Sequence, residues 1–226
     1  MPPVIAPVTS SICLKPVPLL PRGTGSKRKH IPKLAEILTA VPFDTVVEPF
    51  GQGLWISQAL HQAKNSILKG IIAAESMVDM RSIWMAWATP GWRPEIESWL
   101  RKWQLLSIKE SWLEIKAVWE THQSTGEVCP LAAAAGLAVR ILTFSGICRD
   151  TPGSGRLNIK WNKSQLKRWS RYTPIWPKSP PACFQIYEDY GQVQYPADTS
   201  KTLSLIDPPY AGDISAPPPT RRSGRY

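Results

Sequence analysis

Apolar residues follow two different spacings along the chain, and together these spacings predict a mixed α/β fold. Short apolar runs bounded by turn residues predict β-strands at 45–47, 67–74 and 203–206. Apolar side chains at helical spacing predict helices at 31–38, 54–60, 94–103, 107–122 and 130–143. Strands and helices mixed in this order are typical of a parallel sheet with helices packed on it.

A basic stretch follows the last predicted helix and is expected to contain a β-hairpin. Two short alternating segments flank the turn sequence Pro-Gly-Ser-Gly. The second arm places Leu157, Ile159 and Trp161 on one face and Asn158 and Lys160 on the other. From 140 to 180 the chain carries nine Lys or Arg and one acid, interleaved with aromatic residues. This imbalance favours contact with phosphates over a merely solvated face.

Tryptophans fall on the apolar stripes of two predicted helices, at Trp99, Trp103, Trp112 and Trp119. Large aromatic side chains at helical spacing are more often core anchors than stacking platforms for nucleic-acid bases. We therefore expect these four side chains to lie in the core.

The length, charge and cysteine content of the chain narrow its class. Its 226 residues suit one domain with an inserted subdomain. The formal net charge of +10 favours a polyanionic partner, with nucleic acid ahead of membrane because no apolar run reaches the ~18 residues of a membrane span. The four cysteines are widely spaced, which favours reduced thiols in a cytoplasmic protein over disulfides or a zinc site. We expect a monomer with no bound metal.

The clearest chemical motif is Asp207-Pro208-Pro209-Tyr210, which follows the apolar run 203–206. The prolines end strand pairing and hold the flanking side chains at the carboxyl end of the strand, where open α/β sheets bind ligands. An Asp carboxylate and a neighbouring carbonyl can accept both hydrogens of an exocyclic amine, and Tyr offers a π-face to a planar base. The motif predicts methyl transfer to an amino nitrogen; the alternative is ordinary turn chemistry.

Two acids follow predicted strands upstream. Glu48 opens the loop Glu-Pro-Phe-Gly-Gln-Gly, whose glycines Gly51 and Gly53 let the backbone approach a cofactor. Glu75 ends the strand at 67–74, about twenty residues beyond that loop, where nucleoside-binding βαβ units place an acid for the ribose hydroxyls. The alternative for Glu75 is an acid that starts a helix.

Taken in order, a cationic glycine loop at 22–29, Glu-Pro-Phe-Gly-x-Gly, a long insert and Asp-Pro-Pro-Tyr resemble the adenine-specific DNA methyltransferases of the DNA adenine methylase type. The resemblance implies a doubly wound (Rossmann-like) α/β methyltransferase core with an inserted, mainly helical, hairpin-bearing recognition subdomain. The segments that it implies are a proline-rich lead-in at 1–21, a core at 22–78 and 184–210, an insert at 79–183 and an irregular tail at 211–226.

The same resemblance implies roles for individual residues. The expected catalytic residues are Asp207, Pro208, Pro209 and Tyr210. The expected S-adenosylmethionine site comprises Gly25, Ser26, Lys27, Glu48, Pro49, Phe50, Gly51, Gly53, Glu75 and Asp189, with Glu188 as the alternative to Asp189. The expected contacts to double-stranded DNA are Arg149, Arg156, Asn158, Lys160, Lys163, Lys167 and Arg168.

The chain departs from the family pattern in three places. The loop after Phe50 is one residue shorter, Ser145 replaces an asparagine, and sixteen residues follow Tyr210 where relatives continue through further strands. We therefore expect the strand ending at Asp207 to lie at a sheet edge and the chain to be a truncated methyltransferase. The alternatives are a methyltransferase of base amines in ribosomal RNA and a catalytically inactive DNA-binding remnant.

Overall fold

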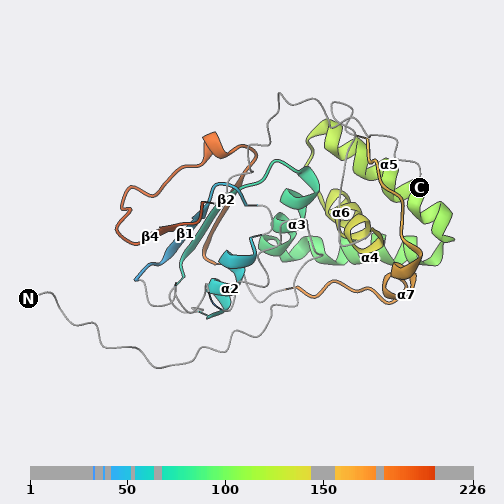
Figure 1. Ribbon diagram of the computed structural model, residues 1–226, viewed down its shortest axis with the longest axis horizontal. Helices are drawn as coiled ribbons and strands as arrows, with labels where there is room; N and C mark the ends of the chain where they lie inside the picture. Colours follow the sequence, from blue (N-terminus) through green and yellow to red (C-terminus); the bar gives the residue numbers. More distant parts are fainter. Residues whose placement is uncertain are drawn as a thin grey trace, which may run out of the picture.

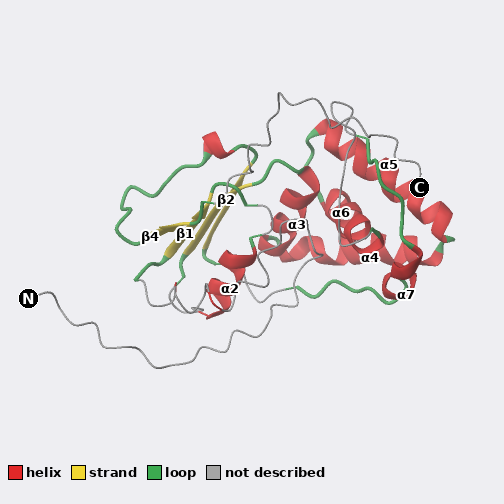
Figure 2. Ribbon diagram, viewed as in Figure 1, coloured by secondary structure: helices red, strands yellow, loops and turns green. Residues whose placement is uncertain are grey.

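The computed structural model describes residues 33, 38, 42–51, 54–63, 68–143, 156–176 and 181–206. These residues form a four-stranded parallel sheet beside a layer of helices (Figures 1 and 2). The strands are β1 (Thr45–Glu48), β2 (Gly70–Ala74), β3 (Cys183–Tyr187) and β4 (Thr202–Ser204), in the spatial order β3-β2-β1-β4. The expected mixed α/β class is therefore confirmed.

The helices whose bounds are described occupy the connections after β1 and after β2. They are α2 (Trp55–Ala63), α3 (Val78–Ala88), α4 (Arg93–Leu105), α5 (Ile108–Thr125), α6 (Pro130–Leu142) and α7 (Leu166–Trp169), with 3-10 turns η2 (Pro90–Trp92), η4 (Lys163–Gln165) and η5 (Tyr190–Gln192). The connection from β3 to β4 is fully described and contains only η5. Within the described part of the chain, β4 lies at one edge of the sheet, next to β1.

The two central strands, β1 and β2, are mostly buried, whereas the outer strands β3 and β4 are half-buried or exposed. All five residues of β2 are buried, which is typical of a parallel strand flanked on both faces. The register places Val46 opposite Ile71 on one side and opposite Leu203 on the other. These apolar side chains join one continuous hydrophobic core with the helices.

Sequence signals set the ends of the long helices. Ser107 and Glu110 form a capping box at the start of α5, and Gly126 ends that helix with a left-handed φ of 74°. Pro130 occupies the first turn of α6, whose small residues allow close packing. The helices predicted at 94–103, 107–122 and 130–143 are thus confirmed as α4, α5 and α6, with shifts of a few residues at their ends.

Tryptophan side chains fill the helical layer, as predicted. Trp103, Trp112 and Trp119 are buried, and Trp99 packs against the same core while partly exposed. Two tryptophans of α3, Trp84 and Trp87, are completely buried and meet at an angle of 73°. Edge-to-face contacts of this kind stabilise aromatic cores.

Two predicted elements, the helix at 31–38 and the hairpin, lie partly outside the described residues. Of the helix predicted at 31–38, only Lys33 and Leu38 are described, and both are helical. The first arm of the hairpin lies outside the described residues, and the second arm contains a single bridge residue, Leu157. The predicted alternation nevertheless holds, because Leu157 is buried while Asn158 and Lys160 are exposed.

At Gly136, α6 packs closely against α3. A Cβ atom built on Gly136 would lie 2.7 Å from Cβ of Asp79, whose carboxylate forms a buried ion pair with Arg140 at 2.8 Å. Real Cβ atoms do not approach this closely, so a side chain here must push the two helices apart.

We therefore predict that Gly136→Ala lowers the free energy of unfolding by roughly 1–3 kcal/mol, although alanine favours helix more than glycine does. Urea unfolding followed by tryptophan fluorescence measures this change. Gly91→Ala is the matched control, because a Cβ there meets nothing within 4 Å. Equal stability of the two variants would contradict the close packing of α3 against α6.

Candidate functional site

A cleft of about 340 Å³ opens at the carboxyl ends of β1, β2 and β3. The loops that follow the three strands supply its walls, since parallel strands end at the same edge of a sheet. Its lining residues are Pro49, Phe50, Gly51, Ala74, Glu75, Ser76, Glu188, Asp189 and Tyr190. Five of the residues predicted for a cofactor are among them: Pro49, Phe50, Gly51, Glu75 and Asp189.

Gly51 joins the loop after β1 to the end of β2. Its N–H donates to the carbonyl oxygen of Ala74 at 2.8 Å. A Cβ on residue 51 would lie 2.9 Å from that same oxygen, so only glycine fits without displacing the loop. The glycine therefore sets the depth of the cleft between Phe50 and Glu75.

Glu48 is the last residue of β1 and does not line the cleft. Its carboxylate is buried and accepts hydrogen bonds from the N–H of Ser57, at 2.9 Å, and from the Ser57 hydroxyl. Ser57 belongs to the first turn of α2, where backbone N–H groups lack partners within the helix. Glu48 thus fixes the start of α2 relative to β1, and the role expected for it in cofactor contact stays a prediction.

Glu75 is a buried carboxylate on the wall of the cleft. Its side chain accepts a hydrogen bond from the N–H of Met77 at 3.0 Å. Burial raises the pKa of the Glu75 carboxyl above its ordinary 4.5; the Met77 N–H opposes this shift and the nearby Asp79 adds to it. A ligand hydroxyl that donated a hydrogen bond to this carboxylate would compensate part of the burial.

Arg81 holds two walls of the cleft and was missed by the sequence reasoning. Its guanidinium donates to the carbonyl oxygens of Glu75 at 3.0 Å and Ser76 at 2.9 Å. It also lies 3.6 Å from the carboxylate of Glu188, on the loop after β3. With a side chain 5% exposed, Arg81 positions the loops of β2 and β3 from behind.

The loop after β3 contributes two acids and an aromatic ring. Asp189 accepts a hydrogen bond from the N–H of Gly191 at 2.7 Å, which shapes the turn η5. Glu188 pairs with Arg81, and both acids line the cleft. Tyr190 packs on Phe50 with ring centroids 5.1 Å apart and planes inclined at 36°. Two aromatic rings thus flank the cleft beside its acids.

The remaining predicted core residues fall outside the described part of the chain. They are Gly25, Ser26, Lys27, Gly53, Asp207, Pro208, Pro209 and Tyr210. The described residues just before the Asp207-Pro208-Pro209-Tyr210 motif run along the edge of the sheet, where the N–H of Leu205 donates to the carbonyl of Val47 at 2.8 Å. The strand β4 therefore ends at the same edge as the cleft.

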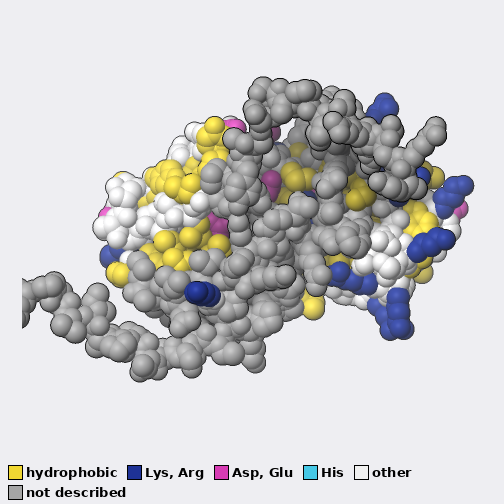
Figure 3. Space-filling model, in the orientation of Figure 1, with side chains coloured by type: hydrophobic (Ala, Val, Ile, Leu, Met, Phe, Trp, Pro, Cys, Tyr) yellow, Lys and Arg dark blue, Asp and Glu magenta, His cyan; other side chains and the backbone are white. Residues whose placement is uncertain are grey.

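A basic segment covers the helical layer. Residues 156–176 contain six Lys or Arg and no acid, and Figure 3 shows Lys and Arg side chains gathered over the helical end of the molecule. The predicted DNA contacts in this segment are all exposed, namely Arg156, Asn158, Lys160, Lys163, Lys167 and Arg168; Arg149 lies outside the described residues. Among described residues, the ion pairs include none of Lys160, Lys163, Lys167 and Arg168.

Backbone contacts attach this basic segment to the helices. The N–H of Leu157 donates to the Glu120 carboxylate at 2.7 Å, and the Gln104 amide donates to the carbonyls of Trp169 and Tyr172, both at 2.8 Å. Trp169 is buried in the core. The segment is therefore held by its backbone and apolar side chains, which leaves its cations facing outward.

The comparisons with known proteins do not identify a relative. No protein-family model matches the chain, and no curated protein is significantly similar to it. Within the described part of the chain, none of the helices is both long and apolar enough to cross a membrane. The described residues include no group of three or more His, Cys, Asp or Glu placed to hold a metal ion. Of the cysteines, Cys129 and Cys183 are free thiols, while Cys13 and Cys148 lie outside the described residues.

We predict that Glu75→Gln stabilises the protein at neutral pH, because glutamine keeps the acceptor for the Met77 N–H and removes the buried charge. The raised pKa means that the folded state binds more protons than the unfolded state at pH values above about 4.5, so the wild type loses stability as the pH rises through that region. The difference between variant and wild type should therefore grow with pH, as measured by urea unfolding at several pH values. Exposed Glu95, changed to Gln, is the control for removal of a surface charge. A difference for Glu75→Gln that stays constant or shrinks with pH would contradict the prediction.

Proposed function

We propose that this protein transfers a methyl group from S-adenosylmethionine to the amino nitrogen N6 of adenine in duplex DNA. The observation that carries the proposal is the cleft itself. Phe50, Gly51, Glu75 and Asp189 come from three segments far apart in the sequence, and all four line one cavity at the carboxyl edge of a parallel sheet.

The order of the strands supports a nucleotide-like ligand at this edge. The order β3-β2-β1-β4 matches the first four strands of a doubly wound sheet, in which the chain changes direction beside β1 and ligands bind at the carboxyl ends. We infer such a core here, with α3 to α7 and the basic segment as its target-recognition insert. The β3–β4 connection departs from this pattern, because a doubly wound sheet has a helix there.

The chemistry of the cleft suits a nucleoside with a charged tail. A volume of about 340 Å³ lies at the lower end of the range for small-molecule sites. The Glu75 carboxylate would accept hydrogen bonds from ribose hydroxyls, and Asp189 or Glu188 would accept one from the adenine amine. The rings of Phe50 and Tyr190 offer flat apolar surfaces to a purine.

The reaction also needs residues that bind the target base, and the Asp207-Pro208-Pro209-Tyr210 motif would supply them. S-adenosylmethionine, when bound, supplies a methyl group on a positively charged sulfur. Asp207 would accept one hydrogen of the target amine and the carbonyl of Pro208 the other, so that the nitrogen lone pair points away from the ring. Tyr210 would stack on the flipped base. Alignment of the two reactants can lower the barrier by roughly 7 to 11 kcal/mol.

The basic segment would hold the DNA. Six outward-facing cations at 156–176 provide phosphate contacts, which fix the position of the duplex without reading its sequence. Contacts of this kind must also offset the few kcal/mol needed to flip a base out of the helix.

The direct test is transfer of a labelled methyl group from S-adenosylmethionine to duplex DNA of mixed sequence, with nucleoside analysis of the product. We predict label in N6-methyladenine for the wild type and at least a hundredfold less for Asp207→Ala, because correct positioning of the amine is lost. Glu95→Gln serves as the control and should retain full activity, since Glu95 is exposed on α4, away from the cleft. A folded protein that binds the cofactor and DNA but transfers no label would contradict the enzyme and leave a binding module.

We further predict that Lys160→Ala with Lys163→Ala weakens DNA binding and reduces the dependence of log K on log salt by roughly 1 to 2, about 0.9 for each lost phosphate contact. Binding titrations at several salt concentrations measure this slope. Lys69→Ala with Lys201→Ala removes the same charge from the opposite, amino-terminal edge of the sheet and should leave the slope unchanged. The same loss in both pairs would show a general charge effect and not an interface.

A further inference from the structure

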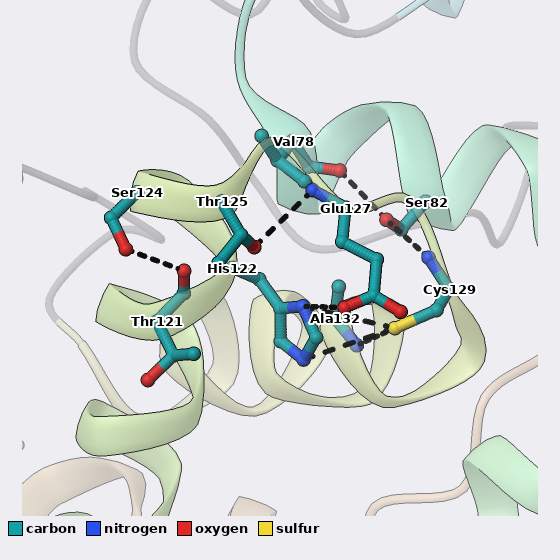
Figure 4. Close-up of polar contacts among 9 residues, drawn as sticks. All are labelled: Val78, Ser82, Thr121, His122, Ser124, Thr125, Glu127, Cys129 and Ala132. Carbon is teal, nitrogen blue, oxygen red and sulfur yellow. Dashed lines mark hydrogen bonds and ion pairs between the residues drawn. The ribbon is translucent and has the colours of Figure 1, made fainter.

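Three side chains with complementary chemistry meet where α5 ends and α6 begins (Figure 4). His122 lies in the last turn of α5, Glu127 lies in the connecting loop, and Cys129 is the N-cap residue of α6. None of them lines the cleft or belongs to the basic segment. The arrangement is therefore independent of the function proposed above.

The sulfur of Cys129 faces the imidazole of His122. Sγ lies 3.8 Å from Nε2 and 3.9 Å from Nδ1 of the ring. The carboxylate oxygen of Glu127 lies 3.7 Å from Nδ1, on the same side of the ring as the sulfur in Figure 4. A thiol, an imidazole and a carboxylate thus lie together, and these groups can serve as nucleophile, base and orienting acid.

The backbone around Cys129 holds the thiol at the start of a long helix. Sγ accepts a hydrogen bond from the N–H of Ala132 at 3.4 Å, in the first turn of the 13-residue helix α6. The N–H of Cys129 donates to the hydroxyl of Ser82 at 3.3 Å, and that hydroxyl donates to the carbonyl of Val78 at 2.8 Å. These bonds connect the loop to α3 and limit the positions that the sulfur can take.

The nucleophile in thiol exchange is the thiolate, so the sulfur needs a nearby group that can take its proton. The imidazole of His122 lies close enough to the sulfur to act in this way. Cys129 is half-buried as a residue and the neighbouring Glu127 side chain is 64% exposed, whereas the His122 side chain is only 10% exposed. A small reagent can therefore meet the sulfur while the imidazole stays sheltered.

We propose that Cys129 is a nucleophilic thiol that exchanges with small disulfides, with His122 as its proton acceptor and Glu127 as the group that orients His122. In this step His122 takes the thiol proton and the thiolate attacks one sulfur of the disulfide. The bond between the two disulfide sulfurs breaks, and the departing sulfur leaves with the electron pair as a thiolate that can take up the proton. Cys129 ends in a mixed disulfide, and one small thiol is released.

The test compares two cysteines in the same full-length protein. Cys183 is the internal reference, because it is free and more exposed than Cys129. The folded protein is incubated with hydroxyethyl disulfide at neutral pH, quenched with acid, digested and analysed by mass spectrometry at each site. Exposure alone predicts faster modification of Cys183, whereas the proposal predicts faster modification of Cys129.

Two further measurements distinguish activation of the Cys129 thiol by His122 from simple exposure of the thiol to the reagent. His122→Asn should slow modification of Cys129 by at least about tenfold and leave Cys183 unchanged, because the variant removes only the proton acceptor. Glu127→Gln should slow it less. Unfolding the wild type in urea should also slow the modification of Cys129, although it makes the thiol more accessible. This comparison needs no variant, so it holds even if a variant does not fold.

Three results would overturn the proposal. They are a folded Cys129 that reacts no faster than Cys183, an unchanged rate at Cys129 in folded His122→Asn, and faster modification of Cys129 after unfolding. Any of them would leave Cys129 as a residue that caps α6 and does nothing more.

Discussion

The buried ion pair between Asp79 and Arg140 is the interaction on which the arrangement of this protein depends. Both side chains are almost completely buried, and Asp79 also accepts a hydrogen bond from Gln123 at 3.2 Å. Removing one partner of such a pair leaves an unpaired buried charge and typically lowers the free energy of unfolding by about 3–5 kcal/mol. Asp79 thus joins α3 to α5 and α6, while Arg81, two residues along the chain, joins α3 to the loops of the cleft. The first turn of α3 therefore links the helical layer to the candidate site.

Sequence reasoning found the parts of the site that depend on local pattern. Apolar runs followed by an acid or a glycine predicted β1 and β2. They also predicted the cleft residues Gly51 and Glu75, because parallel strands end at the same edge of a sheet and bring the residues that follow them together. It missed α3, which is buried on almost every side and places Asp79, Arg81 and Ser82 among its buried apolar residues, so the helix has no clear amphipathic period. Arg81 was missed with it, since the partners that justify burying a charged residue lie on loops far apart in the sequence. The role of Glu48 in fixing α2 is also invisible in a motif, because it depends on where Ser57 falls in space.

The two proposed activities place different demands on one helical layer. For the layer to hold DNA, its outer cations must stay exposed, and the contacts of Gln104 with the carbonyls of Trp169 and Tyr172 secure this by fixing the backbone beneath them. For Cys129 to react, the start of α6 must keep its geometry, and the packing of α6 on α3 at Gly136 secures that. Both depend on rigid helices and neither needs a large movement of the fold.

The contact between Phe50 and Tyr190 sets an energetic threshold for entry into the cleft. The centroids are 5.1 Å apart, so the two rings already contact each other. Such pairs contribute about 0.5–1.5 kcal/mol of stabilisation beyond their buried area. A ligand that separates them must replace this contact with its own. A flat aromatic ring can do so on two faces at once, whereas an aliphatic or strongly hydrated group cannot. The pair would thus act as a filter for planar ligands before any acid in the cleft forms a hydrogen bond.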